Sequence, residues 1–157
     1  MIANRYYVGA GTGESENQLV AFDKALLSAG VGNYNLVRLS SILPAGCKPV
    51  YAVDLPEGSL LPVAYSTATS DVEGETVVST IGVGIPKDKS KVGIIMEYSD
   101  VGLDIKESAV LTRLRDMIRE AFEARGWELE KIIDTSVSKR VEGHDYVTTF
   151  ACIAEWW

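Results

Sequence analysis

Few residues of this chain are of the types that usually carry out catalysis, and one pair of serines stands out. Ser40 and Ser41 directly follow the strand-like segment NYNLVRL, and Pro44 comes soon after them. A serine hydroxyl can act as a nucleophile when its neighbours activate it. Two serines at the end of a strand nevertheless form a turn or a cap more often than a catalytic site. The pair is therefore a candidate for chemistry only if the wider sequence supports it.

The other reactive groups indicate structural roles. The only histidine, His144, lies in a polar Gly-His-Asp segment with no residue to orient it, so we expect it in a solvated loop. Cys47 and Cys152 form neither a CxxC nor a zinc-ligand pattern, so we expect free thiols that are buried or half-buried, and no metal site. The glycine-rich stretch 9–13 lacks the lysine–serine ending of a phosphate loop and the full dinucleotide spacing, and it predicts a flexible turn.

Two acidic residues are expected beside apolar neighbours. In VGIIMEY, alternation places Glu97 on the strand face that carries Gly93 and Ile95. Partial desolvation there would favour a protonated carboxyl that can donate a proton, whereas a strand-end glutamate pointing into solvent is the alternative. Asp23 follows Leu19 by one helical turn on the apolar side of a predicted helix. An acid in that position needs a cationic partner, which could equally be a nearby lysine or arginine.

Two amphipathic helices and several strands must position these groups. The first helix is expected to begin at a capping box in residues 15–18 and to end at Gly30, and the second begins at a capping box in residues 104–107 and ends at Gly126. Strands are expected at 36–43, 49–53, 60–69, 76–85, 92–98, 128–137 and 146–156. Because each helix must cover a sheet face, the pattern predicts an α+β fold.

Composition narrows the class of protein. A chain of 157 residues with 46% hydrophobic and 24% charged residues is typical of one globular domain. The net charge of −7 disfavours a nucleic-acid partner and permits a cationic substrate. No apolar stretch approaches the length of a membrane span or resembles a signal peptide, so we expect a cytoplasmic protein without a membrane partner.

Several blocks of sequence give Ser40 and Ser41 a chemical context. The segment NYNLVRLSSILP resembles the cleavage region of the pyruvoyl-dependent arginine decarboxylases. The similarity continues in LPEGSLLPVAY, SDVEGETVVSTIGVGIPKDKSKVGIIMEY and FEARGWELEKI. These blocks occur in the family's order with matching intervals and span most of the chain from Glu14 onward. Together they form a specific signal, although no single block would.

The resemblance implies that the chain cuts itself between Ser40 and Ser41, giving a beta chain of residues 1–40 and an alpha chain of residues 41–157. The Ser41 hydroxyl would attack the Ser40 carbonyl, and elimination from the resulting ester would leave a pyruvoyl group at position 41. This covalent cofactor would form a Schiff base with L-arginine, which would lose CO2 to give agmatine. No external cofactor is expected.

The resemblance also implies roles for other residues. Glu97 matches the family's proton donor. Asn35 matches an asparagine linked to self-processing and catalysis, where its amide could stabilise an oxyanion, although an asparagine in a turn is the alternative. Asp23 and Leu19 match the substrate pocket, with Asp23 holding the guanidinium of arginine. Arg38 matches an arginine of the strand before the cleavage point, and we interpret it as structural.

By resemblance the single domain, residues 1–157, is a four-layer αββα sandwich. Three protomers would form a homotrimer with active sites between neighbours, and pairing of two trimers stays open. Two alternative functions also stay open. The first is a pyruvoyl decarboxylase for another amino acid, such as aspartate, histidine or ornithine, and Asp23 argues against an acidic substrate. The second is an unprocessed, non-catalytic structural or regulatory subunit. The sequence does not separate polyamine biosynthesis from acid resistance as the pathway.

Overall fold

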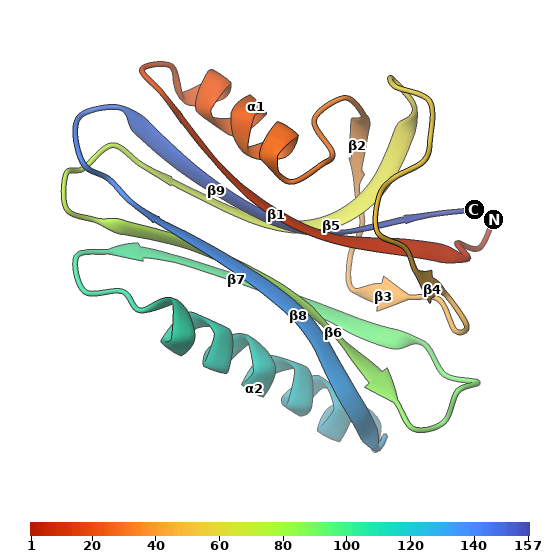
Figure 1. Ribbon diagram of the computed structural model, residues 1–157. Helices are drawn as coiled ribbons and strands as arrows, with labels where there is room; N and C mark the ends of the chain where they lie inside the picture. Colours follow the sequence, from red (N-terminus) through yellow and green to blue (C-terminus); the bar gives the residue numbers. More distant parts are fainter.

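Two β-sheets lie face to face, and each carries one helix on its outer side (Figure 1). The structure is a computed structural model that describes residues 1–157. Helix α1 (Gln18–Ser28) packs on one sheet and helix α2 (Glu107–Arg125) on the other. The strands are β1 (Arg5–Ser15), β2 (Asn35–Arg38), β3 (Ile42–Leu43), β4 (Lys48–Pro49), β5 (Leu60–Ser70), β6 (Thr76–Pro86), β7 (Gly93–Gly102), β8 (Leu129–Arg140) and β9 (Tyr146–Trp156). The expected α+β class is confirmed, and the layers are compatible with the expected sandwich.

Strand order explains how the segment around the two serines is held. The five-stranded sheet has the order β2-β5-β9-β1-β4 and the four-stranded sheet the order β3-β7-β6-β8. Strand β2 pairs in parallel with β5, whereas β3 pairs antiparallel with β7. The chain therefore passes from one sheet to the other between Arg38 and Ile42, which divides the continuous strand expected at 36–43.

The glycine-rich stretch 9–13 is not a turn, and our expectation there was wrong. It lies within β1, which pairs with β9 along its whole length. Gly9, Gly11 and Gly13 alternate on the strand face beneath α1, as the two-residue period of a strand requires. A Cβ atom at Gly11 would lie 2.6 Å from the Ala25 carbonyl oxygen, and one at Gly9 would lie 2.5 Å from the Ala29 carbonyl oxygen. The glycines are thus needed for close packing of α1 on the sheet.

Both helices occur where expected, but neither begins with the expected capping box. The side chain of Asn17, not Ser15, caps α1 by accepting hydrogen bonds from the backbone N–H groups of Leu19 and Val20. Lys106 occupies the N-cap of α2 without a side-chain cap, and Glu107 instead accepts hydrogen bonds from two serines of β8.

Neither helix is long and apolar enough to cross a bilayer. The strand expected at 49–53 is reduced to the short β4.

The core between the sheets contains one carboxyl group without a partner. Ala151 and Ile153 of β9 face this core, and Glu155 continues the same strand face. Glu155 is only 4% exposed, and its Oε1 atom forms no hydrogen bond. Burial raises the pKa of Glu155 to about 7, because the charged form loses its hydration.

The free energy of unfolding should therefore depend on pH through Glu155. The pKa of Glu155 in the folded state lies above the usual 4.5. The free energy of unfolding therefore falls as pH rises from about 4.5 to about 7, and it stays at the lower value above pH 7. We expect Glu155→Gln to raise the melting temperature at pH 8, by an amount equivalent to about 1–3 kcal/mol, and to have little effect at pH 5. Thermal unfolding at both pH values tests this, with the exposed Glu73→Gln as the matched control. Equal gains at both pH values would contradict it.

Candidate active site

The peptide bond between Ser40 and Ser41 lies where the chain crosses from one sheet to the other. On one side of it, the backbone N–H of Leu39 donates a 2.8 Å hydrogen bond to the Val63 carbonyl of β5. On the other side, the N–H of Ile95 in β7 donates a 2.8 Å hydrogen bond to the Ser41 carbonyl. Each end of the crossing is thus fixed to a different sheet. A break in this bond would leave both segments attached to strands.

Glu97 lies on β7 close to this crossing, and its carboxylate has a partner that sequence analysis missed. The Nη2 atom of Arg38 donates a 2.6 Å hydrogen bond to Glu97 Oε1. This hydrogen bond raises the pKa of the Arg38 guanidinium above its usual value. Ile95, on the same strand face, lies in the core between the sheets, as alternation predicted. The carboxyl nevertheless has a cation beside it in addition to apolar neighbours.

A polar cavity of about 300 Å³ opens between β5 and β7 beside this ion pair. Its lining residues are Arg38, Ser66, Thr67, Glu97, Tyr98 and Ser99. The volume is at the lower end of the range for small-molecule sites, about 300–1,000 Å³. A second hollow, of about 450 Å³, lies between α1 and β5, and Thr67 borders both. The two hollows therefore adjoin along β5.

The second hollow contains Leu19 but not Asp23. Leu19 lines it with Phe22 of the same helix, and the Leu19 side chain is 74% exposed. Asp23 is also exposed and forms no ion pair within the chain, so the alternative of a local lysine or arginine partner is not realised. No hydrogen bond joins Asp23 to Ser41 or Glu97 in one chain. The structure thus brings Leu19 towards the Glu97 cavity and leaves Asp23 facing outwards.

Asn35 lies at the start of β2 and holds the loop that precedes β5. Its Nδ2 atom donates a 2.8 Å hydrogen bond to the Gly58 carbonyl, and its backbone N–H donates to the Ser59 carbonyl. Asn33 makes a comparable tie, from Nδ2 to the Glu57 carboxylate. The Asn35 amide has one further N–H that no group in the chain accepts. The contacts that Asn35 makes within the chain are those expected of an asparagine that stabilises a turn.

Comparison with known proteins decides how this geometry is to be understood. A model of the pyruvoyl-dependent arginine decarboxylase family matches residues 5–155. The chain belongs to the pyruvoyl-dependent arginine decarboxylase family. A family member from Methanococcus aeolicus is 46% identical over 148 residues, which cover 94% of this chain and 87% of that protein. A member from Methanocaldococcus jannaschii is 46% identical over 99% of this chain and 92% of that protein. A member from Thermococcus kodakarensis is 46% identical over 80% of this chain and 78% of that protein.

Members of this family carry a covalently bound pyruvoyl group, and the residues at the crossing fit such a group. Ser41 would begin the second fragment, and its carbonyl is already held by the Ile95 N–H. Ser41 is partly buried, so a group at this position would be sheltered without being closed off. Neither thiol competes with it as a nucleophile, because burial raises the pKa of Cys47 to about 11 and that of Cys152 to about 12. His144 lies in an exposed loop, as predicted.

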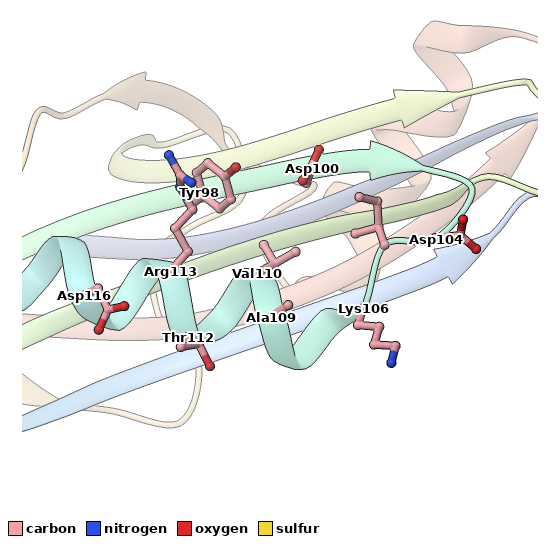
Figure 2. A pocket seen from close by; sticks show the side chains of 10 residues that line it. Tyr98, Asp100, Asp104, Lys106, Ala109, Val110, Thr112, Arg113 and Asp116 are labelled. Atoms are coloured by element: carbon pink, nitrogen blue, oxygen red, sulfur yellow. The ribbon is translucent and has the colours of Figure 1, made fainter.

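A larger hollow on the molecule contains none of the predicted site residues. It has a volume of about 500 Å³ and lies between the end of β7 and α2. Figure 2 shows Arg113 of α2 beside Tyr98 of β7, with Asp104 and Lys106 at the loop that leads into the helix. Its charged residues lie at the end of β7, in the loop that follows and on α2, and no family motif in the sequence pointed to them. We therefore place the candidate active site on the other side of β7.

Asn35 gives a direct test of the site. If its free amide N–H stabilises the oxyanion formed during cleavage, Asn35→Ala should slow the appearance of fragments by about 100-fold. Asn33→Ala is the matched control, because it removes a similar amide tie two residues earlier. Its cleavage should change by less than about twofold. The half-time of cleavage, followed by denaturing electrophoresis, checks both. Similar slowing of cleavage in the two variants would show that Asn35 acts only by holding the loop before β5.

Proposed function

We propose that this chain is a self-processing, pyruvoyl-dependent arginine decarboxylase that converts L-arginine to agmatine and CO2. The observation that carries the proposal is the position of the Ser40–Ser41 bond, which is fixed between the two sheets and closely follows Arg38, the hydrogen-bond partner of Glu97. The family match over residues 5–155 supports the same reaction. The relatives described above all bear the name of this enzyme.

Self-processing begins at the hydroxyl of Ser41. Its oxygen attacks the Ser40 carbonyl carbon, the C–N bond breaks, and the two residues become joined through an ester. Loss of the Cα proton of residue 41 then expels Ser40 as a free carboxylate and ends the first fragment there. Uptake of water and release of ammonia leave a ketone at position 41. The hydrogen bonds at Leu39 and Ser41 keep both ends in place throughout.

The pyruvoyl group supplies an electrophilic ketone that binds the amine of the substrate and withdraws electrons from the carbon that carries the carboxylate. The chain's own residues then orient the substrate and move a proton. Glu97 is the acid that lies at the cavity, and it gives a proton to the α-carbon after CO2 has left. Ser66, Thr67 and Ser99 provide the polar walls of the cavity.

A carboxylate is needed to bind the guanidinium of the substrate. Asp23 can supply it if the active site lies between neighbouring protomers. We propose a homotrimer in which Asp23 and Leu19 of one protomer complete the cavity of the next. Three large apolar side chains of α1 are exposed in the single chain, which supports burial at an interface: Leu19, Val20 and Leu27. Strands β5 and β7 also have open edges on the same side, beyond their short pairings with β2 and β3.

The state of the cysteines supports a reducing compartment. Cys47 and Cys152 are free thiols and form no disulfide. Free thiols are usual in the cytosol, whereas exported proteins tend to form disulfides. The free thiols of this chain support the proposal that the enzyme works in the cytoplasm.

Intact-mass measurement on denatured protein tests self-processing. The wild-type chain should give fragments 1–40 and 41–157, the second of them lighter by one ammonia than its encoded sequence with serine at position 41. Ser41→Ala should give one full-length mass, because it removes both the nucleophile and the leaving oxygen. Ser40→Ala is the matched control and should still be cleaved, because residue 40 contributes only its carbonyl. A single full-length mass for the wild type would reject the proposal.

Substrate choice is tested by assaying CO2 release from a panel of amino acids. We expect activity with arginine, and we expect Asp23→Asn to raise the KM for arginine about tenfold or more with a smaller change in kcat. Asp71→Asn, which changes an exposed acid outside the cavities, should match the wild type. Activity on aspartate alone would overturn the choice of substrate.

A further inference from the structure

Arg38 and Glu97 lie on different sheets and, once the chain is cut, on different fragments. Arg38 is the last residue of β2 and precedes the cleavage point, whereas Glu97 lies in β7. Their side chains meet at 2.6 Å beside the cavity between β5 and β7. The ion pair thus joins the two fragments at the site itself.

The guanidinium of Arg38 is fixed by more than this ion pair. Its carbon lies 4.5 Å from the centre of the Tyr65 ring, and Nη2 donates a weaker, 3.4 Å hydrogen bond to the Tyr65 carbonyl. The Tyr65 ring stacks on the buried ring of Phe150, with ring centres 5.1 Å apart. A series of contacts therefore leads from the core to the guanidinium and then to the carboxylate of Glu97.

A purely structural role accounts poorly for this arrangement. The side chains of Arg38 and Glu97 are 57% and 35% exposed, and ion pairs with that much exposure add little to stability. The pair does, however, hold Glu97 as a carboxylate that points to one place in the cavity. A carboxylate bound in this way has no proton to give, so it must take one up before it can act as an acid.

We propose that Arg38 is a positioning residue for decarboxylation, which holds Glu97 as a carboxylate so that it acts first as a base and then as an acid. This inference rests on the proposed function. The substrate enters with an α-ammonium group, which must lose a proton before its nitrogen can attack a ketone. Glu97 takes that proton. When CO2 leaves, the electron pair of the broken C–C bond stays on the α-carbon, and Glu97 returns a proton to it. Water later releases the amine, which regains its proton from solvent.

The kinetic experiment uses the cleaved protein in three variants besides the wild type. Arg38→Met removes the guanidinium and Arg38→Lys keeps a cation. Arg119→Met is the matched control, because Arg119 forms a comparably exposed ion pair with Asp116 on α2, outside the cavity. Intact mass confirms cleavage, and the melting temperature should stay within a few degrees. We expect Arg38→Met to lower kcat about tenfold or more with KM changed less than about twofold, Arg38→Lys to recover part of the loss, and Arg119→Met to match the wild type.

Nitrogen-15 NMR of the arginine side chains supplies a measurement that needs no activity. In uncleaved Ser41→Ala protein, the Nη signals of Arg38 should show a hydrogen-bonded guanidinium, and adding Glu97→Ala should shift them to those of a guanidinium that keeps only the weaker Tyr65 hydrogen bond. An unchanged signature, or unchanged kcat in Arg38→Met, would overturn the inference while the proposed function stands. Failure of Arg38→Met to cleave would also overturn it and assign Arg38 to self-processing. If cleaved wild-type protein makes no agmatine, the proposed function fails, and the NMR result alone decides whether Arg38 holds Glu97.

Discussion

The rest of the structure depends on how the backbone crosses between the two sheets at Ser40 and Ser41. A hydrogen bond from Leu39 to Val63 ties one end of the crossing to the five-stranded sheet, and one from Ile95 to Ser41 ties the other end to the four-stranded sheet. The crossing is short, so both residues stay where the sheets place them. Loss of the bond between them therefore leaves each new chain end attached to its own sheet. The same constraint brings Arg38 and Glu97 together from opposite sheets.

The first 40 residues can stay in place after cleavage because β1 is an inner strand of the five-stranded sheet. It pairs with β9 over residues 5–15 and with β4 at its beginning, and both of these partners belong to the second fragment. The three glycines beneath α1 let the helix pack tightly on that strand. Ion pairs of Arg5 with Asp54 and of Glu14 with Lys139 also join the fragments. The fold thus supports a chain that is cut after residue 40 without its two fragments separating.

Sequence patterns predicted the parts of the fold in which local spacing matches the tertiary environment. Helix α2 and strand β9 were predicted well because apolar spacing and a left-handed Gly126 mark them clearly. Strand β1 was missed, because glycines suggest a turn until the helix that packs over them is known. Glu107 was assigned to a capping box, although its partners are serines of β8 that come about thirty residues later. Arg38 was read as structural for the same reason: its partner Glu97 lies far away in sequence. The cationic partner expected for Asp23 could not be identified from the sequence, because Asp23 forms no ion pair within the chain.

The central claim is that the bond before Ser41 breaks by itself and leaves a ketone at that position. Borohydride reduction of purified protein, followed by mass measurement of the denatured fragments, tests it most directly. The account predicts that the fragment beginning at position 41 gains the mass of two hydrogen atoms and that fragment 1–40 gains none. A full-length chain that takes up no hydrogen, after incubation long enough for cleavage, would contradict it.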